Sequence, residues 1–195
     1  EVKSCADNGV TEITELKIGY DGIVIANSKS APHFDLTLQQ VWMALAKEVP
    51  VGGQIVANPY KKWSEIDPSL PDQAIEVLGP PPTSGTRDAF VELGIEAGAR
   101  KYPTADALRS DNEKKFKEIV DPLRKDGWVD AGENDNAIVQ TLTKTPGSLG
   151  VFGWSFLEEN MDKVKGASVN GVKPSAGAIA DGSYPLSRSL YIYVK

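Results

Sequence analysis

The chain has 195 residues, and its 21 basic and 27 acidic side chains leave a net charge of −6. An acidic chain without a basic run is a poor match for nucleic acid or an anionic membrane surface, whose phosphates attract Lys and Arg. The hydrophobic fraction of 41% is typical of a globular protein with a core. One cysteine, Cys5, and one histidine, His33, cannot supply a Cys/His zinc site, so we expect no metal and no cofactor.

Apolar strands alternate with amphipathic helices along the chain, which predicts an α/β protein. Residues 18–26 are apolar on both faces and predict a buried strand in a sheet covered by helices. Thr37 and Gln40 have the spacing of a capping box and predict the start of a helix. The other expected elements are a loop or hairpin at 49–60, strands at 75–78, 151–156 and 190–195, helices at 87–98, 112–125 and from 134 or 135 to 145, and a hairpin turn at 170–171.

The most informative segment is LGPPPTSGTRDAF, which predicts a strand, a tight turn and a helix, with Ser84 at the start of the helix. The first turn of a helix has unpaired N–H groups and a partial positive charge, so it attracts anions. The hydroxyls of Thr83, Ser84 and Thr86 can add hydrogen bonds, and Gly85 lets the backbone approach a ligand. Arg87 can add a charge-assisted contact. Together these residues predict an oxyanion site.

From the residues alone a second interpretation stays open, because Ser, Thr and Gly are also ordinary N-cap residues that need no ligand. The segment is not a P-loop, since no Gly-Lys-Ser/Thr follows at the required spacing. It is not a nucleophile elbow either, since no G-x-S-x-G surrounds Ser84. A serine nucleophile would also need a base, and His33 is the sole histidine. We therefore expect no catalytic residues.

The segment Ser84–Phe90, SGTRDAF, resembles the phosphate-contacting loop and helix of the phosphate-binding subunit of bacterial high-affinity phosphate ABC importers. Four other segments resemble the same family, in the same order along the chain. They are IGYDGIVIANS followed by LTLQQVWMAL, then ENDNAIVQTLTKTPGSLGVFGWSF, and finally SYPLSRSLYIYV. The resemblance thus covers nearly the whole chain.

This resemblance implies a type II periplasmic-binding-protein fold, with two α/β lobes that are joined by crossing strands and close over one anion. Residues 1–27 and 152–195 would be a remnant of the first lobe. Residues 28–151 would form the second lobe, with the anion-binding loop at 79–90. The rest of the first lobe would lie in an N-terminal segment missing from this chain. That segment would supply the carboxylate that accepts the proton of phosphate.

The resemblance also implies which residues hold the anion, with two departures from the family pattern. Many relatives have an arginine where this chain has Pro80, and we expect Arg87 to serve in its place. Many also have Asp-Gly where this chain has Pro82-Thr83, so Thr83 is expected to add a hydroxyl. The expected phosphate-binding residues are Thr83, Ser84, Gly85, Thr86 and Arg87.

The expected function is therefore the binding of inorganic phosphate, without catalysis, and its delivery to the membrane permease of an ABC transporter. The expected location is the bacterial periplasm. Pro80 keeps open a binding protein for another oxyanion, such as sulfate, molybdate or a phosphonate. A phosphate-ester hydrolase acting through Ser84 or Thr86 is a further alternative, as is a secreted surface or signalling protein that keeps the fold without transport.

Overall fold

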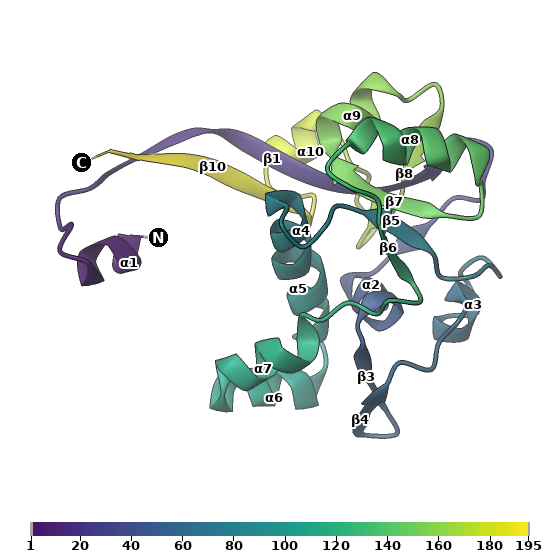
Figure 1. Cartoon of the computed structure of the whole chain (residues 1–195), viewed down its shortest axis with the longest axis horizontal. Helices are drawn as coiled ribbons and strands as arrows, with labels where there is room; N and C mark the ends of the chain where they lie inside the picture. The colour runs from purple at the N-terminus through teal and green to yellow at the C-terminus, as the bar shows by residue number, and fades with distance from the viewer. Residues whose placement is uncertain (1, 195) are drawn as a thin grey trace.

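The computed structural model describes residues 2–194 and centres on a mixed six-stranded sheet (Figure 1). The strand order is β10-β1-β7-β5-β6, and β8 also pairs with β1. β5, β6 and β7 run parallel to one another, whereas β1 is antiparallel to β7, β8 and β10. The strands of this sheet are β1 (Thr14–Ser28), β5 (Val77–Gly79), β6 (Trp128–Asp130), β7 (Leu149–Gly153), β8 (Val164–Gly166) and β10 (Ser187–Val194). The predicted α/β class is confirmed.

Helices cover both faces of the sheet, which explains the uninterrupted apolar run in β1. Ile23 and Ile25 belong to the larger core, and Val24 and Ala26 belong to the smaller core on the opposite face. The prediction of a buried strand at 18–26 is correct for residues 22–26 and wrong for residues 18–21, which are largely exposed. There β1 pairs only with β10, and these two strands project from the body as a ribbon (Figure 1).

Several local predictions are confirmed. The helix α2 begins with the expected capping box, since the Gln40 N–H donates to Thr37 Oγ1 and the Thr37 N–H to Gln40 Oε1. Asn134 caps α8, and Asn170 and Gly171 both have positive φ in a tight turn. The remaining short strands are β2 (Asp35–Leu36) with β9 (Ser168–Val169), and the hairpin β3 (Glu48–Val51) with β4 (Gln54–Ala57). The helices apart from the segment 85–99 are α1 (Val2–Asp7), α2 (Leu38–Leu45), α3 (Trp63–Ile66), α6 (Pro103–Asp111), α7 (Glu113–Val120), α8 (Asp135–Lys144), α9 (Trp154–Glu159) and α10 (Ala176–Ala180).

The helix predicted at 87–98 is present as one continuous helical segment, 85–99. It consists of α4 (Gly85–Phe90), a π-helical turn η1 (Val91–Glu96) and α5 (Ala97–Ala99). The π-helical turn adds a residue to the helix and shifts the side chains that follow it. One end of this segment therefore follows the turn after β5, and its other end packs against α2.

Three expected elements differ in extent from the structure. The strand expected at 151–156 ends at Gly153, because α9 begins at Trp154. The helix expected at 112–125 ends at Val120, close to Pro122, which lacks the N–H that a longer helix would need. The strand expected at 190–195 is found as part of β10, but it is exposed in the ribbon rather than buried, and Lys195 lies outside the described residues.

The expected division into lobes stays a prediction. Within residues 2–194, the segment from Phe152 to Leu186 packs in the same two cores as the strands before it: Phe152 and Leu157 lie in the smaller core, and Tyr184 and Leu186 in the larger. The described part of the chain is thus one body with a projecting ribbon. No helix among these residues is long and apolar enough to cross a membrane.

Gly98 lies where α5 packs against α2, so a substitution at this position tests how closely the two helices approach. A Cβ on Gly98 would lie 2.1 Å from the Leu38 carbonyl oxygen and 2.9 Å from the Trp42 Cβ. We expect Gly98→Ala to lower the free energy of unfolding by about 1–3 kcal/mol, measured by urea denaturation, because neither atom can move easily. The control is Gly177→Ala in α10, where a Cβ would meet no atom within 4 Å. Equal stability of the two variants would contradict this close packing.

Candidate functional site

The candidate site lies where the three parallel strands end at one edge of the sheet. β5 ends at Gly79, β6 at Asp130 and β7 at Gly153. From β5 the chain enters the β5–α4 turn (residues 80–84), and from β6 it enters the β6–α8 turn (residues 131–134), so the N-termini of α4 and α8 follow neighbouring strands. This edge is where ligands bind in open α/β sheets, because loops and helix N-termini converge there.

Ser84 is the N-cap of α4 and is largely buried. Its Oγ accepts the Thr86 N–H at 3.3 Å, and its carbonyl accepts the Asp88 N–H at 3.1 Å. Because the Ser84 hydroxyl acts as an acceptor here, its own proton is still available to a ligand. Ser84 therefore has the ordinary capping role that the sequence left open, and its hydroxyl proton remains free to donate.

Gly85 faces open space at the start of the same helix. A Cβ on Gly85 would meet no heavy atom within 4 Å. Within residues 2–194 the backbone N–H groups of Gly85 and Arg87 have no acceptor in the protein. The first turn of α4 thus presents unpaired amides to an unobstructed surface, which is the arrangement that binds an anion.

Thr83 joins the two turns that follow the parallel strands. Its hydroxyl donates to Glu133 Oε1 at 3.0 Å, and both side chains are exposed. With its proton donated to Glu133, the Thr83 hydroxyl can only accept a further hydrogen bond. Glu133 was not predicted as part of the site, because the strand β6 that places it beside β5 was not predicted either.

The guanidinium of Arg87 is not directed toward the unpaired amides. Its Nη1 donates to the Pro80 carbonyl at 3.1 Å and to Asp130 Oδ1 at 3.2 Å, and its Cζ lies 4.5 Å from the centroid of the Trp128 ring. Only 13% of the side chain is exposed. Burial lowers the pKa of Arg87, and the hydrogen bond and charge of Asp130 oppose this change. The guanidinium therefore lies behind the β5–α4 turn.

Asp135, in the first turn of α8, is the second carboxylate near this edge. Burial raises its pKa, the Gly153 backbone hydrogen bond opposes the rise, and the charge of Glu133 adds to it. The sequence contains both residues within a segment that resembles the family, but nothing in the local pattern marks either as part of the site. The structure contains no group of three or more His, Cys, Asp or Glu that could hold a metal, among the residues it describes.

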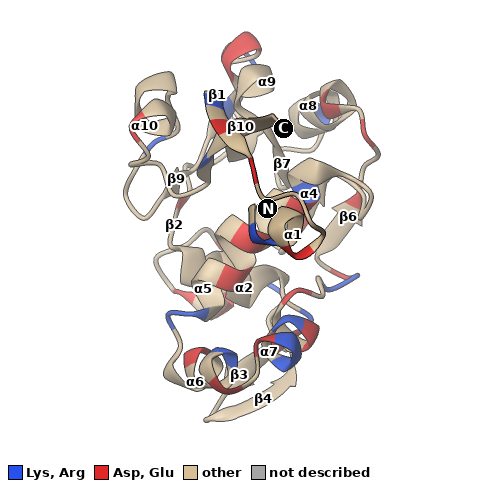
Figure 2. Ribbon diagram, turned by 90° about the vertical axis from the view of Figure 1, so that its left-hand side faces the viewer, with Lys and Arg blue, Asp and Glu red and all other residues tan. Residues whose placement is uncertain are grey.

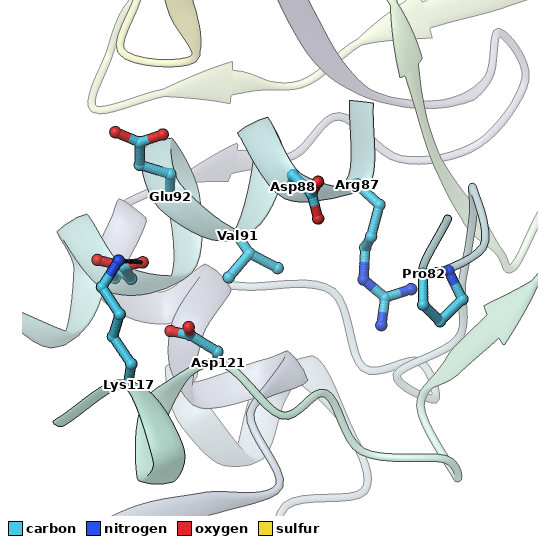
Figure 3. A pocket seen from close by; sticks show the side chains of 8 residues that line it. Pro82, Arg87, Asp88, Val91, Glu92, Lys117 and Asp121 are labelled. Atoms are coloured by element: carbon cyan, nitrogen blue, oxygen red, sulfur yellow. Dashed lines mark ion pairs between the residues drawn. The ribbon is translucent and has the colours of Figure 1, made fainter. Parts of the chain in front are cut away.

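A hollow of about 390 Å³ is lined by Pro82, Arg87 and Asp88, which flank residues 83–86, but by none of residues 83–86 themselves (Figure 3). The buried carboxylate of Glu96 forms ion pairs with Arg100 at 2.9 Å and with Lys117 at 3.4 Å. Burial, together with the charge of Glu96, raises the pKa of Asp121 to about 6. The residues that line the hollow are Pro82, Arg87, Asp88, Val91, Glu92, Glu96, Lys117 and Asp121. The hollow is mainly acidic, so it is unsuited to an anion.

His33 and Cys5, the residues of a possible Cys–His pair, are in different surroundings. His33 is exposed, and its Nε2 lies 3.3 Å from Ser168 Oγ, beside β2 and β9. Cys5 is a free cysteine in α1. His33 is therefore hydrogen-bonded away from Ser84.

The whole chain, residues 1–195, matches a family model described as a PBP superfamily domain. The chain belongs to the PBP superfamily. It is 30% identical over 201 residues to the phosphate-binding protein PstS of Staphylococcus epidermidis, and 30% identical over 200 residues to the protein SphX of Synechococcus elongatus. Each alignment covers 100% of this chain and 50% of the relative. The chain thus spans about half the length of these curated relatives.

Solved structures share the fold. A possible phosphate-binding protein from Planctomyces limnophilus matches with a TM-score of 0.69 and 25% identity, over 99% of this chain and 59% of that protein. An ABC-type phosphate transport receptor from Vibrio cholerae matches with a TM-score of 0.64 and 19% identity, over 97% of this chain and 69% of that protein. The predicted periplasmic-binding-protein fold is confirmed.

The raised pKa of Asp121 predicts how the free energy of unfolding depends on pH. Its pKa is about 6 in the folded protein against a usual value of 3.8, so the folded state holds more protons than the unfolded state between these values. The stability associated with the neutral carboxyl is fully present below pH 4 and is lost as the pH rises through 6. We expect Asp121→Asn to raise the free energy of unfolding at pH 8 by about 1 kcal/mol, after allowing for solvent screening, and to change it little at pH 4.

The control for this experiment is Asp162→Asn, at an exposed carboxylate. Urea unfolding at pH 4, 6 and 8 compares the two variants with the original chain. A lower stability of Asp121→Asn at pH 8 would show that the ion pairs nearby outweigh the cost of burying this carboxylate.

Proposed function

We propose that the protein containing this chain binds inorganic phosphate between two lobes and presents it to the permease of an ABC transporter. The observation that carries the proposal is the first turn of α4, where two backbone amides are unpaired, a Cβ on Gly85 would meet open space, and the Ser84 hydroxyl keeps a proton to donate. The names of the relatives support it, because several curated relatives are called phosphate-binding protein PstS. The location proposed with this function is the periplasm or another site outside the cytoplasmic membrane.

The proposed ligands of phosphate are backbone and hydroxyl groups of residues 83–86. The backbone amides of Gly85 and Arg87 would donate to phosphate oxygens, and the Ser84 hydroxyl would add its free proton. The hydroxyl of Thr86, which is partly exposed, would donate as well. Thr83 would accept a hydrogen bond from a protonated phosphate oxygen, because its own proton goes to Glu133. Arg87 belongs to the proposed site and supports it from behind the turn.

The second half of the anion shell is proposed to come from a lobe that this chain contributes only in part. The ribbon of β1 and β10 supports this, since it projects from the body with exposed apolar side chains, among them Leu16, Ile18 and Ile192. The packing of residues 152–186 in the main body suggests a lobe boundary near Gly22 and Ser187, where β1 changes partner from β10 to β7. A hinge at this point would let the two lobes close over the anion.

A second candidate is a binding protein for another oxyanion, such as sulfate. The observation that favours it is that the Arg87 guanidinium is hydrogen-bonded to Asp130 and to the Pro80 carbonyl, so it is not free to bind the anion. Sulfate has no proton to offer to Thr83 at neutral pH, so the two ions separate the candidates. We propose no catalytic role: within residues 2–194 the Ser84 hydroxyl is paired with an amide and not with a base.

Phosphate binding is tested by isothermal titration of the full-length protein with phosphate and with sulfate. We expect heat with phosphate and at least tenfold weaker binding of sulfate, because a hydroxyl that can only accept a hydrogen bond repels a fully deprotonated oxyanion. Equal affinity for both would favour the general oxyanion candidate. No heat with either ion would refute the proposed function.

Gly85→Ala tests the site itself. Because a Cβ at this position meets no atom of the protein, we expect no loss of folding stability. The same Cβ would stand between the amides and the anion, so we expect phosphate affinity to fall by about tenfold or more, as for the loss of one charge-assisted hydrogen bond. Gly177→Ala, in an equally open place on α10, is the matched control and should bind normally. Normal phosphate binding by Gly85→Ala would place the site elsewhere.

A further inference from the structure

We propose that the side chain of Arg87 has a positioning role: the guanidinium holds the β5–α4 turn in the shape that presents the anion site and does not itself contact the anion. This inference rests on the proposed function and refines the expectation that Arg87 is a ligand. It is carried by the contacts of the guanidinium with three groups: the Pro80 carbonyl in the β5–α4 turn, and the side chains of Trp128 and Asp130 on β6.

The first contact is with the β5–α4 turn, which has few backbone N–H donors of its own. Residues 80–82 are three consecutive prolines, which have no backbone N–H. The turn is closed by one backbone hydrogen bond, from the Ser84 N–H to the Pro81 carbonyl at 3.0 Å. The buried Pro80 carbonyl needs a donor, and Arg87 Nη1 supplies it at 3.1 Å. The side chain of Arg87 thus replaces hydrogen bonds that the prolines cannot make.

The second set of contacts fixes the guanidinium against β6. Asp130 Oδ1 accepts from Arg87 Nη1 at 3.2 Å and from Trp128 Nε1 at 2.9 Å. The indole of Trp128 lies so close to Gly79 that a Cβ there would be 2.2 Å from it, and the guanidinium lies over the same ring. The last residue of β5, the end of β6 and the first turn of α4 are thereby held together.

The charge of Arg87 is directed inward by this arrangement. The carboxylate of Asp130 lies within ion-pair distance, and 13% of the Arg87 side chain is exposed. Figure 3 shows the guanidinium beside Pro82, on the side of the turn that faces the hollow. An anion at Gly85 would therefore meet amides and hydroxyls first, and it would gain from Arg87 mainly through a rigid turn that needs no ordering on binding.

The test uses the full-length protein and titration with inorganic phosphate. Arg87→Lys keeps the charge but loses the planar fork that reaches Pro80 and Asp130 together. We expect Arg87→Lys to weaken phosphate binding about tenfold. Asp130→Asn keeps an oxygen that can accept from Arg87 and Trp128, so we expect affinity within about threefold of the original, whereas Asp130→Ala should weaken binding about tenfold. The rescue by Asn is a result that a ligand role does not predict.

If Arg87 acted on the anion through its charge, the pattern would reverse. Arg87→Lys would then bind normally, and both Asp130 variants would bind more tightly because a competing negative charge is lost. Either of these results would overturn the proposal. Arg109→Lys, on α6, is the matched control for an exposed arginine with an aspartate neighbour, and thermal unfolding of each variant checks that it is folded.

Amide hydrogen exchange separates this proposal from the proposed function. If the original protein gives no heat with phosphate, the proposed function fails. The turn is then judged without a ligand: faster exchange of the amides at 83–86 in Arg87→Lys, with Arg109→Lys unchanged, supports Arg87 as the residue that holds the turn. Unchanged exchange at 83–86 in Arg87→Lys overturns it, whether or not phosphate binds.

Discussion

The parallel arrangement of β5, β6 and β7 is the constraint on which the rest of the structure depends. Because parallel strands end at the same edge, the turns after β5 and β6 and the N-termini of α4 and α8 come together there. The hydrogen bond from Thr83 to Glu133 and the ion pair of Arg87 with Asp130 connect these two turns. Each pair joins residues more than 40 positions apart, so the site exists only once the sheet has formed.

The two ends of β1 lie in different environments, and we assign them different roles. From Ile23 onward, β1 is covered by helices on both faces and anchors the body. Before Gly22 it forms an exposed apolar ribbon with β10 (Figure 1). A protein that closes over a ligand needs a rigid body for its donors and a connection that can bend, and the change of partner of β1 separates the two.

Charge is distributed so that the proposed anion site depends on dipoles more than on net charge. The chain is acidic overall, and basic and acidic side chains lie side by side on α6 and α7 (Figure 2). The hollow next to α4 is lined mainly by carboxylates, and Arg87 is paired with Asp130. Unpaired helix amides attract a small anion without a net positive charge that would also attract polyanions, because their partial charges act only at short range.

Features that depend only on residues close together in the sequence were predictable from it. They are the capping box at Thr37 and Gln40, the turn at Asn170-Gly171, and the start of a helix at Ser84 with small residues beside it. The exposure of residues 18–21 and of β10, and the end of β7 at Gly153, were not predictable, because apolar composition cannot tell a covered strand from a projecting one. Glu133 and Asp130 were missed for the same physical reason: a hydrogen bond across two turns depends on which strands are neighbours. The sequence by itself thus predicted that a helix with unpaired amides in its first turn begins at Ser84, and only the tertiary structure decided that Arg87 turns inward, because its partners Asp130 and Trp128 are brought to it by the pairing of β5 with β6.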